Sequence, residues 1–184
     1  MNKFNRIFRL SAIIAAMLFA SSALADSAAE IDRDADAAIE VFKESIGGSD
    51  VFLDQSAGYL IFPRVIKAGF VIGGETGEGA LRIGGKTVDY YRTSAGSFGL
   101  QAGAQARSMV IAFMTPEALE KFRNSSGWKA GVDGSVALID MGGGKSIDTH
   151  NIKDPVVGFI FGSKGLMANL SLEGSKFSKL DKSE

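Results

Sequence analysis

The sequence predicts an α+β domain: a curved, mostly antiparallel, barrel-like β-sheet with N-terminal helices and one short later helix packed against it. Helical periodicity appears only in residues 27–55 and again after Thr115. Elsewhere, short apolar runs alternate with turn residues, which is typical of antiparallel strands. All 23 glycines follow residue 46, and many interrupt these runs. Glycine within strands marks bulges, sharp bends or close backbone approach, so we expect a strongly curved sheet.

The first 25 residues have the three parts of a cleaved export signal. A basic start is followed by an apolar run at residues 10–20 and by Ala23-Leu24-Ala25, which fits a signal peptidase site. The apolar run is too short to span a bilayer easily. We therefore expect the mature protein to begin at Asp26. It would form one domain over residues 26–184, exported to the periplasm or outer envelope.

The composition excludes several classes of site. The chain has no cysteine, so it has no disulfide, no thiolate metal ligand and no lipid-modified N-terminal cysteine. Residues 1–25 carry three basic and no acidic residues, so their removal changes the formal net charge from −1 to −4. A mildly acidic protein is a poor general binder of nucleic acid, and contact with anionic lipid then requires a local basic patch.

Capping signals predict the helix boundaries. Apolar residues recur every three or four positions from 27 to 46, with Ser27 and Glu30 forming a capping box and two glycines ending the helix. A second, short helix is predicted at 51–55. Thr115, followed by proline, begins a third that ends near residue 124. We expect the first helix to pack on the sheet rather than on a membrane, because its polar face is mostly acidic.

The rest of the chain is predicted to form short strands in an antiparallel meander. Pro63 cannot donate to a sheet ladder, which places the extended residues before it at an edge or a crossover. The glycine-rich segments 73–79 and 94–96 are predicted to be turns, and a polar tail is expected from about residue 174. The predicted strands are residues 59–62, 68–74, 80–83, 87–92, 97–114, 132–141, 156–161 and 166–172. Residues 97–114 form either one long strand or two strands joined at a bend.

The sequence contains no recognisable catalytic or cofactor motif. Its one histidine, His150, falls in a polar loop, where a solvated side chain is expected. The glycine-rich segment 74–79 lies between predicted strands and opens no helix, so it does not fit a dinucleotide-binding loop. Glu75 and Glu78 within it have no acid–base partner nearby and are expected to be solvated. We therefore expect no enzyme, no cofactor and no metal site.

An apolar stretch with two basic residues is the strongest candidate for a binding surface. Arg64 and Lys67 flank Val65-Ile66, an arrangement in which cations meet phosphate while apolar groups enter an acyl layer. The aromatic run at 59–62 either joins this surface or belongs to the core. If the meander brings its first turns together, the lipid-binding candidates are Arg64, Lys67, Arg82, Lys86 and Arg92.

A row of polar residues on a later predicted strand is a second candidate. Gln101, Gln105 and Arg107 alternate along one side of this strand. If they face open solvent, they are the ordinary exposed face of a half-buried strand. If they face a cavity, they favour an enzyme.

Several short motifs follow one another along the chain. They are Ser56…Gly58-Tyr59-Leu60-Ile61-Phe62-Pro63, Lys67-Ala68-Gly69-Phe70, Gly73-Gly74…Gly77-Glu78-Gly79, Gly99-Leu100-Gln101-Ala102-Gly103-Ala104-Gln105 and Gly165-Leu166-Met167-Ala168. In this order they resemble the SYLF domain family, and the likeness covers roughly residues 35–179. Eukaryotic members of this family bind phosphoinositide membranes and, in fungi, actin filaments. Their lipid binding is attributed to a basic N-terminal segment, whereas the first helix here is acidic.

The resemblance implies a non-enzymatic lipid-binding module of the bacterial envelope, because bacterial members are exported single-domain proteins. The expected partner is an anionic phospholipid or a membrane surface. The alternative is a protein-interaction or structural envelope module without a lipid ligand. We expect neither nucleic acid nor actin as a partner of an exported protein.

Overall fold

The computed structural model describes residues 26–140, 153–162 and 172–182. The described part contains three helices and six strands, which confirms the α+β class. The helices are α2 (Ala28–Ser45), α3 (Ser49–Gln55) and α4 (Pro116–Arg123). The strands are β1 (Gly58–Ile83), β2 (Lys86–Phe113), β3 (Trp128–Lys129), β4 (Ala137–Asp140), β5 (Val156–Phe161) and β6 (Lys176–Leu180).

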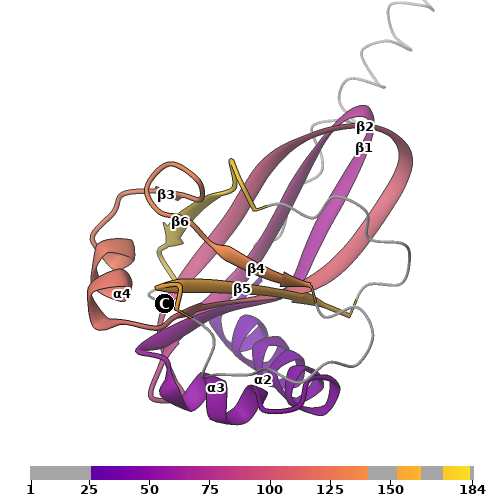
Figure 1. Cartoon of the computed structure of the whole chain (residues 1–184). Helices are drawn as coiled ribbons and strands as arrows, with labels where there is room; N and C mark the ends of the chain where they lie inside the picture. The colour runs from indigo at the N-terminus through magenta and orange to yellow at the C-terminus, as the bar shows by residue number, and fades with distance from the viewer. Residues whose placement is uncertain (1–25, 141–152, 163–171, 183–184) are drawn as a thin grey trace, which may run out of the picture.

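The strands form one curved sheet, as predicted. Its order is β3-β6-β2-β5-β4, and β1 pairs with β2 beside this path. All pairs are antiparallel except β4 with β5. Figure 1 shows α2 and α3 below the sheet and α4 at one side. The residues before Pro63 lie in β1, which pairs only with β2 among the described strands.

The predicted meander of short strands is wrong. β1 and β2 are single long strands, and their pairing runs through both glycine-rich segments that were predicted to be turns, with Gly74 opposite Gly96 and Gly77 opposite Thr93. The turn between β1 and β2 is at Gly84 and Gly85, whose φ angles of 56° and 76° suit glycine. Glycine here permits bending of a strand instead of ending it.

The curvature comes from irregularities in the β1–β2 register. One lies at Pro63, between Phe62 and Val65. At a second, Gly69 pairs with Gly103 and Val71 with Gly99, so that residues 100–102 of β2 lie opposite Phe70 alone. Extra residues in one strand bend a ribbon, and β2 therefore follows the outside of a sharp bend.

The bent ribbon rises from the sheet and returns to it (Figure 1). We call it the arch: residues 64–78 of β1 and 92–107 of β2. Its apex is residue 70 with residues 100–102. The parts of β1 before and after the apex are the two limbs of the arch, and they cross at its base. A Cβ on Gly79 would lie well under 3.0 Å from the Ile61 carbonyl oxygen, and one on Gly77 would crowd the Arg64 carbonyl oxygen. Only glycine permits this approach.

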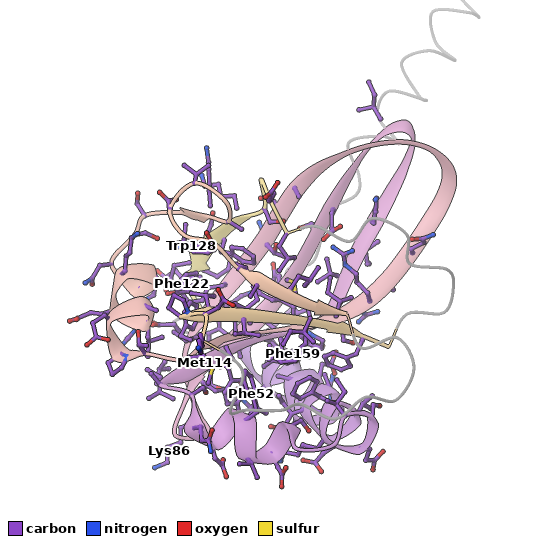
Figure 2. The ribbon with its side chains drawn as sticks, viewed as in Figure 1. Phe52, Lys86, Met114, Phe122, Trp128 and Phe159 are labelled. Atoms are coloured by element: carbon purple, nitrogen blue, oxygen red, sulfur yellow. The ribbon has the colours of Figure 1, made fainter. Side chains whose placement is uncertain are left out.

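Two hydrophobic clusters occupy the two faces of the sheet. Alternate residues of β1 contribute to them, with Tyr59 and Ile61 in the first and Leu60 and Phe62 in the second. The aromatic run therefore belongs to the core. Aromatic rings join helices to strands in both clusters, and Figure 2 labels four of these residues. The ring pairs include Phe42–Phe159 (5.3 Å), Phe52–Phe159 (5.1 Å), Phe122–Trp128 (5.8 Å) and Trp128–Phe177 (5.9 Å).

The predicted helix signals are confirmed. Ser27 and Glu30 form the capping box of α2, and Thr115 caps α4 with Pro116 in its first turn. The second helix differs slightly, because it begins at Ser49 after Gly48 in a left-handed conformation. The caps follow from residues close in sequence, so no long-range contact is needed to define them.

Polar contacts fix α2 on the β1–β2 hairpin. Asp32 accepts hydrogen bonds from the hydroxyls of Thr87 at 2.7 Å and Tyr90 at 2.8 Å. The Arg82 guanidinium donates to Asp36 at 2.6 Å and to the Asp32 carbonyl oxygen at 3.3 Å. These bonds lie beside the apolar face of α2, which is buried against the sheet, and they fix the helix there.

The three tyrosines are expected to ionise late in the folded protein. Burial raises the pKa of Tyr59, and burial together with a nearby carboxylate raises the pKa of Tyr90 and of Tyr91 to about 12. Tyrosinate absorbance at pH 10 should therefore be low in the native protein and near half-maximal in urea. Because the unfolded chain loses these protons first, stability should fall as pH rises from 10 towards 12. A native phenol titrating near pH 10 would contradict the structure.

The predicted solvated tail is wrong. β6 pairs with β2 over Tyr90–Ser94 and with β3, and Phe177 is fully buried between them. Lys182, also expected in the tail, donates to the Glu78 carboxylate at 3.0 Å and to the Asp26 carbonyl oxygen at 2.5 Å. β6 lies between β3 and β2 in the sheet, and its apolar residues Phe177 and Leu180 are three positions apart, so its sequence shows no two-residue alternation.

Other predictions are confirmed in part or lie outside the described residues. Of the strand predicted at 132–141, the structure has only β4, and β5 has the predicted bounds. The export signal, His150 and most of the strand predicted at 166–172 lie outside the described residues. Within the described part, no helix has the length and apolarity required to cross a bilayer.

Candidate functional site

The arch has an uncharged upper part and a charged base. Residues 68–74 of β1 and 93–106 of β2 contain no charged side chain. The residues that bound these segments are Lys67, Glu75, Arg92 and Arg107. The sequence therefore places every charge of the ribbon near its base.

Arg64 and Lys67 are the candidate cations at the base with the weakest neutralisation. The Arg64 side chain is 63% exposed, and its described ion pair is a long one of 3.9 Å with Asp34, which also contacts Arg33. Lys67 is half-buried opposite Gln105, and no ion pair within the described residues includes it. A pair this long and exposed contributes little.

An exposed isoleucine separates these two cations. Ile66 is 43% exposed, and Ile72, on the other limb of β1, is 68% exposed. Large aliphatic side chains are usually buried. One exposed side chain is common on protein surfaces, but two on the same projecting element indicate an interaction surface. Exposed apolar groups therefore lie on the same projecting strand as the two cations.

The other lipid-binding candidates are separated or neutralised. Arg82 is buried under α2 in its ion pair with Asp36. Lys86 is exposed beside the Gly84-Gly85 turn, and Figure 2 shows it at the end of the molecule away from the arch. Arg92 lies at the base of the arch, paired with Glu78. The five candidates thus do not form one basic patch, because the meander assumed for them does not exist.

Two buried carboxylates hold the base of the arch together. Glu75 pairs with Arg107, and their side chains are only 8% and 13% exposed. The register partners of these residues are Ala95 and Val65, so the ion pair joins the two limbs across the bend. The sequence prediction of two solvated glutamates is therefore wrong.

The second buried carboxylate, Glu78, has two cationic partners. Arg92 and Lys182 each donate to one of its oxygens. Burial acts to raise the pKa of Glu78, but the hydrogen bonds and charges of Arg92 and Lys182 outweigh it and hold the pKa below its usual value. Glu78 is therefore ionised near neutral pH. It connects strand β1 to Arg92 of β2 and to Lys182 near the end of the chain.

The three polar residues of the second candidate site have different surroundings in the structure. Gln101 is at the apex bulge, Gln105 is exposed, and Arg107 is mostly buried in its pair with Glu75. Arg107 lines a cavity, but Gln105 is not among the lining residues. Gln105 and Arg107 therefore do not share this cavity.

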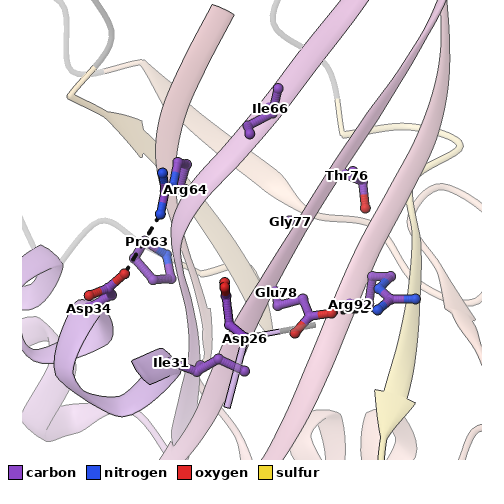
Figure 3. Close-up of a pocket in the computed structure, with 10 residues that line it drawn as sticks. All are labelled: Asp26, Ile31, Asp34, Pro63, Arg64, Ile66, Thr76, Gly77, Glu78 and Arg92. Atoms are coloured by element: carbon purple, nitrogen blue, oxygen red, sulfur yellow. Dashed lines mark hydrogen bonds and ion pairs between the residues drawn. The ribbon is translucent and has the colours of Figure 1, made fainter. Parts of the chain in front are cut away.

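Two adjacent cavities flank Arg64 at the base of the arch. The first has a volume of about 480 Å³ and is lined by residues of α2, β1 and β2, including Ile31, Ile66, Glu78 and Arg92 (Figure 3). The second, of about 390 Å³, is lined by alanines and a valine of α2 with Arg107. Asp34, Pro63 and Arg64 belong to both linings, so Arg64 lies on the wall between them.

The acidic groups of the described residues are not arranged as a metal site. No cluster of three or more potential metal ligands occurs in residues 26–140, 153–162 and 172–182. The carboxylates at the base of the arch are instead paired with arginine or lysine. The chemistry available there is recognition by charge and apolar contact.

The fold and this base define an α+β domain with a candidate binding surface on a projecting β-ribbon. Residues 94–183 match the family model described as Ysc84, Las17-binding protein actin regulator. For residues 94–183 this match confirms the resemblance to the Ysc84 (SYLF) domain family found in the sequence. Domains of this family are binding modules rather than enzymes. A comparison with curated proteins found no match.

Proposed function

We propose that this protein is a non-enzymatic module that binds anionic phospholipid at a bilayer surface, mainly through Arg64 and Lys67. The observation that carries the proposal is the exposed Ile66 between two cations that lack a close carboxylate. The match to a family of binding modules supports the class of function. The expected export signal assigns the bilayer to the bacterial envelope.

Charge neutralisation explains why these two cations are chosen from the five candidates. Arg82 and Arg92 each have a close carboxylate partner, so they add little net positive potential. A basic residue without a close carboxylate contributes about 1 kcal/mol near an anionic membrane. Two such residues contribute about 2 kcal/mol, or roughly 30-fold in affinity, which must overcome the repulsion of an acidic protein.

Reversing both charges is expected to remove binding. The double variant Arg64→Glu plus Lys67→Glu should lose at least roughly 30-fold in affinity for vesicles of phosphatidylcholine with phosphatidylglycerol. Vesicle flotation at low salt measures this directly. Binding of the wild-type protein should also weaken as salt is added, because surface charges are screened.

A matched control changes the same charge elsewhere. Lys86→Glu plus Lys129→Glu replaces two exposed lysines that lie outside the arch, in β2 and β3. This double variant should bind nearly as well as the wild-type protein. Absence of wild-type flotation would refute the function, and equal binding by both double variants would refute the site.

A protein-binding role is the second candidate, because the family description is that of a protein-binding protein. It predicts a specific partner crosslinked in cells and no phospholipid in the purified protein. Lipid extraction followed by mass spectrometry distinguishes it from the first proposal. Detection of a stoichiometric anionic lipid would favour the lipid-binding module.

A further inference from the structure

We propose that the apex of the arch enters the interfacial layer of an anionic phospholipid bilayer while the cations at its base contact the headgroups. The inference rests on the function proposed above and deepens it, because it assigns the element that penetrates and the depth that it reaches. It assigns penetration to a β-ribbon and not to the N-terminal helix.

The distribution of charge along the arch is the first observation. The upper part, residues 68–74 and 93–106, is uncharged, whereas Arg64 and Lys67 lie directly below it. A charge carried into the acyl region is costly, and a cation at the headgroup level is favourable. The arch is therefore charged at its base and uncharged towards its apex, as one leaflet is charged at its headgroups and apolar towards its centre.

Exposed apolar residues on the arch are the second observation. Ile72 is 68% exposed and is opposite Phe98 in the register, and Ile66 is 43% exposed nearer the base. An isolated two-stranded ribbon is only marginally stable in water. Contact with lipid would bury the exposed isoleucines, and each buried aliphatic side chain gains free energy.

The backbone of the arch limits how deep it can go. Between the residues paired with β6 and those paired with β5, β2 pairs only with β1 among the described strands. Within the described residues, the outer edges of both strands thus present N–H and C=O groups without a sheet partner. Such groups are costly in the hydrocarbon core, so penetration should stop about 5–10 Å into the headgroup and acyl boundary.

The position of the helices is consistent with this orientation. Figure 1 shows α2 and α3 at the end of the molecule opposite to the apex. The exposed face of α2 is mostly acidic, with Glu40 and Glu44 among its exposed residues. An apex-first orientation keeps these carboxylates away from the anionic surface, where they would repel it.

Tryptophan fluorescence provides the test. Ile72→Trp adds one indole at the arch, while Trp128, the only native tryptophan, is 3% exposed and gives a shielded background. Vesicles of phosphatidylcholine with phosphatidylglycerol carry bromine on the acyl chains, either near the headgroup or near the terminal methyl. We expect strong quenching by the shallow bromine and weak quenching by the deep one. Absence of quenching in protein that floats with the vesicles would overturn the inference.

The matched control is Val132→Trp. Val132 is 76% exposed, more than Ile72, and lies outside the arch, so its indole should remain unquenched in the same vesicles. Equal quenching at both positions would also overturn the inference, because it would indicate contact without orientation.

A second pair of variants separates this inference from the proposed function. Ile72→Asp should weaken vesicle binding by about tenfold, whereas Val132→Asp should change it by less than about twofold. Wild-type flotation with no effect of Ile72→Asp would leave electrostatic binding intact and refute insertion alone. Absence of wild-type flotation would refute the proposed function itself.

Discussion

Replacing Gly79 by valine is expected to lower the free energy of unfolding by more than about 3 kcal/mol. The two limbs of β1 cross at this point, and any Cβ on Gly79 would overlap the Ile61 carbonyl oxygen and the Phe62 ring. Phe62 is fully buried, so neither neighbour can move without disturbing the core. The expected result is a protein that is unfolded or has lost the bend of the arch.

Urea unfolding followed by circular dichroism measures this loss. The matched control is Gly96→Val, because a Cβ at Gly96 has no heavy atom within 4 Å. Gly96 is also in a β-strand, where valine is preferred to glycine, so this substitution should be neutral or mildly stabilising. Similar, small effects of both substitutions would show that the limbs of β1 do not cross in contact.

The helices could be predicted because their signals are local. The capping box of α2 and the Thr115–Pro116 start of α4 each involve residues within three positions of one another. Such pairs act before any tertiary contact forms. The curvature of the sheet was also predicted correctly, because glycine within a strand marks a bulge, a bend or a close backbone approach, and all three accompany curvature.

The strand boundaries could not be predicted because glycine-rich segments occur both in turns, which end a strand, and in strands that bend. The segments 73–79 and 94–96 have the composition of turns, but here they allow a continuous ribbon to bend and cross itself. Whether a glycine ends a strand or lets it approach another backbone depends on a partner that lies far away in sequence. Gly79 meets Ile61, and nothing in the residues around Gly79 indicates this contact.

The candidate site was predicted in part for the same reason. Arg64 and Lys67 were identified from neighbouring residues, and the structure leaves them without a close carboxylate. Glu75 and Glu78 were placed in solvent because their partners, Arg107 and Arg92, belong to the other strand of the ribbon. For Glu75, only the bend brings the partner within reach. The sequence does contain one indication of these ion pairs, because two acidic residues on one strand are followed by two arginines on the next.

Removing Arg107 is the second large effect that we expect. Arg107→Met would leave the Glu75 carboxylate buried without its partner, and loss of one member of a buried ion pair costs about 3–5 kcal/mol. Glu75→Met should cost a similar amount, because the Arg107 guanidinium is mostly buried and its Nε already lacks a hydrogen-bond partner. Urea unfolding of each single variant measures these losses.

The double variant Glu75→Met plus Arg107→Met is the decisive comparison. Two apolar side chains of similar length avoid both desolvated charges, so the double variant should be more stable than either single variant. Arg92→Met provides the control, because Arg92 is 46% exposed and Lys182 still neutralises Glu78; its loss should cost less than about 1 kcal/mol. Additive losses in the double variant would mean that Glu75 and Arg107 are not coupled. The two limbs of the arch would then be held at their base by backbone contact at Gly77 and Gly79 alone.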